Sequence, residues 1–197
     1  MARPIENLTP KARKTRADIL FAAREIIGES GVDGLNVLNV CEGARVGRTS
    51  FYNYFEDVSH LVSTIASETA LGIKSKFDAF QAHEPRGLAR LKACLEMVLH
   101  LGADDAETAL LLTALARYDP AVRTILHSEI STEIASMGEQ FSTKRELLTS
   151  YLTSTVLVTV RDIAKGRIER DHIKPIVSFM LAGFEPPGRD DTVIAAP

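Results

Sequence analysis

The sequence lacks tryptophan, contains only two cysteines among 197 residues, and has no long apolar run. Cys41 and Cys94 both lie inside apolar helical patterns, so no disulfide framework of a small secreted protein is indicated. The longest uncharged apolar stretch, 147–160, is shorter than the roughly 20 residues that cross a bilayer. Residues 1–6 have no apolar core of the kind that a secretory signal requires. We therefore expect a cytoplasmic protein without a membrane partner.

Glycine and proline are also scarce. Their totals of 12 and 8 exclude a collagen-like or low-complexity chain, and 45% hydrophobic residues exclude intrinsic disorder. At this length a fold can bury roughly 70% of its extended-chain surface, which is enough for one or two hydrophobic cores.

The sequence has no excess of positive charge, because it contains 23 basic and 26 acidic residues and its formal net charge is −3. That average argues against a nucleic-acid partner, but the charge is unevenly distributed. Residues 1–55 contain eight basic and six acidic residues, a net of +2, and the remainder carries −5. Five of the first sixteen residues are basic, opposed only by Glu6. This start is either a solvated tail or an arm that a polyanion attracts.

Apolar residues recur at intervals of three and four rather than two, which predicts an all-α fold. Thr9 and Asn36 are predicted N-caps, Gly31 is a predicted C-cap, and 81–87 is a predicted loop. The pattern predicts about nine helices, at 10–30, 37–44, 48–55, 58–80, 88–101, 105–118, 120–141, 143–165 and 171–184. Residues 188–197 are predicted to be a disordered tail.

Residues 36–61 contain two helices that are too short to be stable alone, joined by a tight turn. This is the arrangement of a helix-turn-helix, whose second helix enters a DNA major groove. The segment 51–55 holds four of the chain's twelve aromatic residues. Phe51 and Phe55 can face a small core, whereas Tyr52 and Tyr54 can offer a hydroxyl to a phosphate. The alternative is that all four rings build the core.

The spacing of these residues resembles the N-terminal pattern of the TetR family of bacterial one-component transcription regulators. The matching positions are Ile19-Leu20, Ala22-Ala23, Gly31, Val37, Val40, Ala44, Val46, Phe51-Tyr52-Asn53-Tyr54-Phe55 and Leu61. The resemblance implies an N-terminal three-helix helix-turn-helix DNA-binding domain over 1–55. It also implies a larger helical ligand-binding and dimerisation domain over 56–187.

The resemblance further implies a transcriptional regulator, and a repressor is favoured over an activator. Such a protein would bind a palindromic operator in double-stranded DNA as a homodimer, and a small-molecule effector would release it. No cofactor is implied. Carried over from the family pattern, Arg48, Thr49, Ser50 and Asn53 would contact base edges or adjoining phosphates, and Tyr52 and Tyr54 would contact phosphates. The positively charged start, with Lys11, Arg13 and Lys14, would be an arm ahead of the first helix that contacts the minor groove or phosphates. Arg45 in the turn would add a further phosphate contact.

Four positions depart from the family pattern: Arg45 replaces a turn Gly, Gly47 a Ser, Cys41 an Ala, and Val58 a Lys. A left-handed conformation at Arg45 would cost about 1 kcal/mol. Val58 removes one expected phosphate contact. The N-terminus of helix 58–80 could still offer its amides to a phosphate, although Glu56 and Asp57 would compete for them. These departures predict weaker or differently distributed phosphate binding.

The C-terminal half is compatible with the two further roles that the family implies. Apolar surface with a few polar groups suits a small-molecule pocket, and the candidate effector residues are Met97, His100, Leu101, Leu115, Tyr118, Tyr151 and Thr155. A homodimer would match two DNA half-sites, and its candidate interface residues are Leu148, Leu152, Thr155, Thr159, Ile173, Val177, Met180 and Leu181. The alternative for the latter set is an intramolecular core.

No catalytic constellation is found. Residues 28–31 superficially resemble a nucleophile elbow, but they lack its glycine spacing and lie at a helix end. His100 and Asp104, four residues apart, would need a third metal ligand, which the sequence does not identify. A helical small-molecule binding protein without DNA readout, and more remotely a small helical hydrolase, remain as alternatives.

Overall fold

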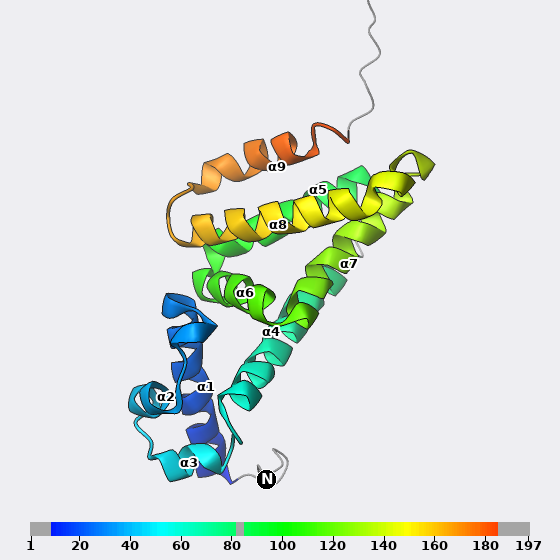
Figure 1. Cartoon of the computed structure of the whole chain (residues 1–197). Helices are drawn as coiled ribbons and strands as arrows, with labels where there is room; N and C mark the ends of the chain where they lie inside the picture. Colours follow the sequence, from blue (N-terminus) through cyan, green and yellow to red (C-terminus); the bar gives the residue numbers. More distant parts are fainter. Residues whose placement is uncertain (1–8, 82–84, 185–197) are drawn as a thin grey trace, which may run out of the picture.

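The computed structural model describes residues 9–81 and 85–184, which form nine α-helices and no strand. The predicted all-α fold is therefore confirmed for this part of the chain (Figure 1). The helices are α1 (Pro10–Ser30), α2 (Val37–Ala44), α3 (Arg48–Tyr52), α4 (Val58–Gln81), α5 (Leu88–Asp104), α6 (Ala106–Tyr118), α7 (Pro120–Ser136), α8 (Arg145–Ala164) and α9 (Ile173–Leu181). Short 3-10 helices lie at η2 (Val32–Gly34), η3 (Glu139–Lys144) and η4 (Arg170–His172). Within these residues no helix is long and apolar enough to span a membrane.

Side-chain caps fix the starts of several helices where the sequence predicts them. The hydroxyl oxygen of Thr9 accepts the amide of Ala12 at 3.3 Å, and Pro10 occupies the first turn of α1. Asn36 and Asn39 each accept the other's backbone amide at 3.0 Å, so α2 begins with a reciprocal capping box. Asp119 caps α7 through the amide of Ala121 at 2.8 Å. These local bonds satisfy amides that a helix start otherwise leaves unpaired.

Four predicted helices end more than one residue away from the end expected. Helix α5 ends at Asp104 rather than at residue 101. Helix α3 ends at Tyr52 rather than at residue 55, because the chain turns there and buries Phe55. Helix α7 ends at Ser136 rather than at residue 141, because Gly138 adopts φ 106°, and Phe141 then stacks on Phe184 at 5.5 Å between ring centroids. The last segment begins with η4, so α9 covers only Ile173–Leu181. The predicted tail at 188–197 lies outside the described residues.

Helices α1, α2 and α3, which we call the head, lie at one end of the molecule (Figure 1). Each helix contributes apolar side chains to a common core that the first turns of α4 complete. The fully buried members include Ile19, Ala23, Val40, Phe51, Phe55 and Leu61. Because α2 and α3 are too short to be stable alone, this shared core holds the helix-turn-helix in shape.

Helix α4 runs from the head toward helices α5 to α9, which we call the body (Figure 1). Its Glu68 pairs with two arginines of α1, Arg16 at 3.7 Å and Arg24 in direct contact. The guanidinium of Arg16 also lies 5.5 Å from the centre of the Phe55 ring. Helix α1 packs against α6 as well, so both α4 and α6 position the head on the body.

The body is built around α8, which packs against α5, α6 and α7, whereas α9 packs on α5. Helices α5 and α8 approach closely at Gly102, where an added Cβ would lie 2.7 Å from the carbonyl oxygen of Val160. The start of α5 is tied to α7 by Glu133, which is 2% exposed and accepts the amide of Gly87 at 2.9 Å. The carboxylate also lies 3.8 Å from the guanidinium of Arg90.

Candidate nucleic-acid interface and the head–body groove

The turn of the helix-turn-helix is closed by Arg45 in the left-handed conformation, with φ 55° and ψ 43°. Its amide donates to the carbonyls of Cys41 and Glu42, and the amide of Val46 donates to the carbonyl of Cys41 at 3.0 Å. These bonds hold the turn although the residue is not glycine. The strain expected at Arg45 from the sequence is therefore present in the structure.

Helix α3 places most of its predicted DNA-contacting side chains on the surface. Arg48, Thr49 and Asn53 are exposed, and Tyr52 is 54% exposed with its ring edge-on to that of Phe51. Ser50 and Tyr54 are half-buried, and Tyr54 packs against the head core. The alternative that all four aromatic rings build the core is wrong, because Tyr52 lies outside it.

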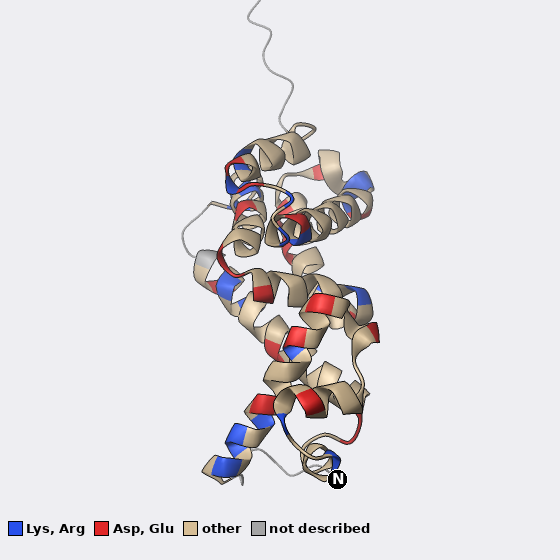
Figure 2. Ribbon diagram, turned by 90° about the vertical axis from the view of Figure 1, so that its left-hand side faces the viewer, with Lys and Arg blue, Asp and Glu red and all other residues tan. Residues whose placement is uncertain are grey.

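Basic side chains lie at the same end of the molecule. Lys11, Arg13 and Lys14 are exposed in the first turns of α1, within the helix and not ahead of it. Figure 2 shows these turns as blue bands at the lower end of the molecule, where Figure 1 also places α3. Lys14 pairs with Asp18 at 3.0 Å, but this exposed pair is weak and can exchange for a phosphate. The predicted basic side chains of α1 thus lie at the same end of the molecule as α3 (Figure 1 and Figure 2).

At the start of α4, the carboxylate of Asp57 binds one amide, as the sequence predicts, but no bond of the Glu56 carboxylate to an amide of this helix is seen among the described residues. Asp57 accepts the amide of His60 at 2.7 Å, and the amide of Glu56 donates to Nδ1 of the same histidine at 3.2 Å. Val58, where the family pattern has a lysine, is half-buried against the core. One amide at this helix start is already bound by Asp57.

Solved structures similar to this chain share one fold. A TetR-like transcriptional regulator from Rhodococcus sp. RHA1 matches with a TM-score of 0.72 at 16% identity, over 90% of this chain and 98% of that one. The chain has the fold of TetR-like transcriptional regulators. The chain is also similar in structure to NalD, the secondary repressor of the MexAB-OprM multidrug efflux pump in Pseudomonas aeruginosa. That match has a TM-score of 0.65 at 19% identity and covers 87% of this chain and 97% of that one.

A third match is the ketosteroid transcriptional regulator KstR2 of Mycobacterium tuberculosis, with a TM-score of 0.63 and 14% identity over 85% of this chain and 93% of that one. No protein-family model matches the sequence, and neither does any curated protein. The TetR-like fold predicted from the N-terminal pattern therefore extends over nearly the whole chain.

The candidate effector residues differ in burial. Leu101 and Leu115 are buried in the core, and Met97, His100 and Thr155 are half-buried. Nδ1 of His100 is buried without a hydrogen-bond partner among the described residues. Tyr118 and Tyr151 are each about half exposed, at 51% and 49%.

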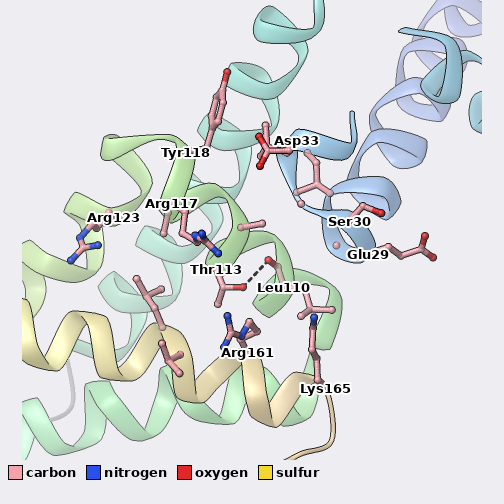
Figure 3. Close-up of a pocket in the computed structure, with 18 of the residues that line it drawn as sticks. Glu29, Ser30, Asp33, Leu110, Thr113, Arg117, Tyr118, Arg123, Arg161 and Lys165 are labelled. Carbon is pink, nitrogen blue, oxygen red and sulfur yellow. Dashed lines mark hydrogen bonds between the residues drawn. The ribbon is translucent and has the colours of Figure 1, made fainter. Parts of the chain in front are cut away.

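Of this set only Tyr118 lines a cavity of about 560 Å³ between the head and the body. The end of α1 and η2 form one wall, and α6 and α8 form the other (Figure 3). We call it the head–body groove. Arg123 of α7 also lines it. Sequence reasoning missed the groove because its residues come from α1, η2, α6, α7 and α8, and no local pattern links them.

Most of the candidate dimer residues lie inside the chain's own core. Leu152, Thr159, Ile173, Val177, Met180 and Leu181 are buried, and Leu148 and Thr155 are half-buried. The intramolecular alternative describes the six buried residues, so a second copy would have to contact other side chains of α8 and α9. Phe179 of α9 is 81% exposed and lines an apolar groove with Ile168, Pro175 and Ile176.

The remaining sequence candidates have structural roles. Asp104 pairs with Arg170, while His100 lies on the preceding turn of α5. Among the described residues, no group of three or more His, Cys, Asp or Glu side chains could hold a metal ion. Gly31 caps α1 through its amide, which donates to the carbonyl of Ile27 at 2.9 Å. Both cysteines are free and buried, and burial raises the pKa of Cys94 to about 12.

Proposed function

We propose that this protein is a transcriptional regulator that binds double-stranded DNA through α3 and the start of α1. The observation that carries the proposal is the exposed surface of Arg48, Thr49, Tyr52 and Asn53, at the same end of the molecule as the exposed lysines and arginine of α1 (Figure 2). A helix of this kind reads base edges in the major groove, and basic side chains beside it fix the protein on the phosphates. Such a protein would act in the cytoplasm.

Selection of random duplex DNA by the purified full-length chain, at two salt concentrations, tests this function. We expect a palindrome to be enriched and its affinity to fall steeply as salt rises, because bound cations are released from the DNA. Failure to enrich any sequence at low salt would instead favour a small-molecule binding protein without DNA readout. Val58 and the strained turn at Arg45 are the features that favour this second function.

Two substitutions then separate sequence readout from phosphate binding. Arg48→Ala should relax discrimination at one base pair by about 1 to 3 kcal/mol, since only a guanidinium there can bond guanine at two points. Tyr52→Phe should weaken binding to all duplexes alike. Tyr151→Phe is the matched control, because Tyr151 is similarly exposed but lies in the body. Full operator affinity and specificity in both Arg48→Ala and Tyr52→Phe would rule out these contacts.

The proposal includes a homodimer in which a second copy covers Phe179 and its neighbours on α9. The apolar groove there has a volume of about 370 Å³ and is lined by Ile168, Pro175, Ile176 and Phe179 together with Arg167 and His172. One head reads only a half-site, so two-fold pairing would allow a palindrome to be bound at both halves. An exposed phenylalanine beside apolar neighbours is the kind of surface that such a contact covers.

The regulator would respond to a small-molecule effector. Any ligand that binds one arrangement of head and body more tightly than another changes the affinity for DNA by that difference. A repressor would be released if the effector favours the arrangement that does not fit the operator.

A further inference from the structure

The head–body groove has the size and the position of a ligand site. Its volume of about 560 Å³ lies within the range of small-molecule sites. Its walls belong to different parts of the molecule, with Gly28 to Asp33 on the head side and α6 and α8 on the body side. A molecule in this groove would therefore touch the head and the body at once.

The body wall of the groove is rich in cations that lack a matching anion. Arg117 of α6 and Lys165, which follows α8, have no ion-pair partner among residues 9–81 and 85–184. Arg161 meets only the carboxylate of its sequence neighbour Asp162, at 3.5 Å, and its buried Nε lacks a hydrogen-bond partner among the described residues. Figure 3 shows Arg161 and Lys165 rising from the α8 side toward α6.

Apolar side chains lie between these cations. Leu110 and Ala114 of α6 and Leu157 and Val158 of α8 line the same groove. The hydroxyl of Thr113 is occupied, because it donates to the carbonyl of Leu110 at 2.9 Å (Figure 3). Guanidinium and ammonium groups beside apolar surface suit a molecule that has one anionic group and an apolar body.

The head wall carries the opposite charge. Glu29 and Asp33 line the groove, and neither has an ion-pair partner in the described part of the chain. Figure 3 shows Glu29 directed away from α6 and α8, so Asp33 is the carboxylate of this wall that the body cations attract across the groove. An anion bound to those cations would weaken this attraction.

We propose that the head–body groove binds a small organic anion, an apolar molecule with one carboxylate, sulfonate or phosphate group. Arg117, Arg161 and Lys165 hold the anionic group, and α6 and α8 contact the apolar part. The groove is then the effector site, a step that rests on the proposed DNA-binding function. Binding loosens the head from the body and changes the affinity for DNA.

The first experiment measures anion binding without DNA, by titrating the full-length chain with the fluorescent sulfonate 8-anilinonaphthalene-1-sulfonate. We expect saturable binding that decanoate displaces. A double variant that carries both Arg117→Gln and Lys165→Gln should bind the sulfonate at least tenfold more weakly, since two charge-assisted contacts are lost. The control Lys76→Gln with Lys144→Gln removes two exposed cations outside the groove and should bind as the original chain does.

A second pair of variants tests the groove from α8. Val158 is 50% exposed, so substitution there leaves the core intact. Val158→Gln replaces an apolar contact by a polar one, and Val158→Glu adds a negative charge to the same change. Val158→Glu should therefore bind the sulfonate at least tenfold more weakly than Val158→Gln does. Thermal melts by circular dichroism establish that each variant is folded. The site would be overturned if three proteins bound the sulfonate with equal affinity: the original chain, the double variant that carries Arg117→Gln and Lys165→Gln, and the single variant Val158→Glu.

Regulation is measured separately, by fluorescence anisotropy of the selected duplex with and without decanoate. We expect decanoate to change the duplex affinity at least fivefold in the original chain and not in Arg117→Gln with Lys165→Gln. If decanoate binds in the groove but leaves duplex affinity unchanged, the effector role is wrong. If no duplex is bound while the sulfonate results hold, the proposed function fails and the anion site stands.

Discussion

The close approach of α5 and α8 at Gly102 leads to a quantitative prediction. An alanine there would place its Cβ 2.7 Å from the carbonyl oxygen of Val160 and 3.0 Å from Cβ of Ile163. Both neighbours belong to α8, and one of them is backbone, so the helices must separate. Gly72 of α4 is a natural control, because an added Cβ meets nothing within 4 Å.

Both substitutions stabilise a helix by replacing glycine, but only Gly102→Ala also creates a steric overlap with a neighbouring helix. Replacing glycine by alanine inside a helix stabilises it by roughly 0.5 to 1 kcal/mol. Gly72→Ala should gain this amount in free energy of unfolding. Gly102→Ala gains a similar term but forces helices apart in a packed core, which costs about 1 to 3 kcal/mol. The difference between the two variants should therefore be about 1 to 3 kcal/mol.

Urea unfolding followed by circular dichroism measures this difference, because a shift of the midpoint at constant slope reports stability. Gly102→Ala should unfold at lower urea than Gly72→Ala. For a chain of this length, thermal midpoints should differ by about 2 to 12 °C. If Gly102→Ala is as stable as Gly72→Ala, the helices are not in contact at Gly102 and the packing described for the body is wrong.

Three further predictions concern single residues. Arg45→Gly should raise the free energy of unfolding by about 0.5 to 1 kcal/mol in urea titrations, because glycine adopts the left-handed turn without strain, and Arg45→Ala should give no such gain. Burial raises the pKa of Cys94 to about 12, against 9.0 for an ordinary thiol, so the unfolded chain loses this proton first as the pH rises. Stability should therefore fall between pH 9 and 10 by about 1 kcal/mol more in the original chain than in Cys94→Ala, and equal losses in urea titrations would contradict the burial of the thiol. Phe179→Glu should convert a dimer into monomers in sedimentation velocity, whereas the same change at the exposed Leu71 of α4 should leave the dimer intact. A dimer that survives Phe179→Glu would exclude the α9 contact.

Local signals made the helix starts predictable. Thr9, Asn36 and Asp119 cap their helices through side-chain bonds to amides two or three residues away, so the relevant interaction lies within a short window of sequence. The left-handed conformation at Arg45 was predictable for a different reason, namely that the family pattern has a glycine at this position.

Tertiary contacts decided what local patterns could not. Phe55 and Phe141 continue the apolar spacing of the preceding helices, but each side chain packs beyond a turn, so the predicted ends of α3 and α7 were too late. Ile173 and Val177 lie on an apolar stripe of α9, which the sequence cannot assign to a second copy or to the chain's own core. In the structure of the single chain both side chains are buried, so they belong to the chain's own core.

The two arginines that share Glu68 restrict how α1 can move on α4. Arg16 and Arg24 are eight residues apart, about 12 Å along the helix axis, and the carboxylate binds both. Sliding α1 along its own axis would lengthen one pair as it shortens the other, so translation is opposed in both directions. Rotation about an axis through the carboxylate changes both distances far less. These two ion pairs therefore oppose sliding of α1 along its axis more than they oppose rotation about Glu68, and rotation is limited instead by the core that the head shares with α4 and by the packing of α1 on α6.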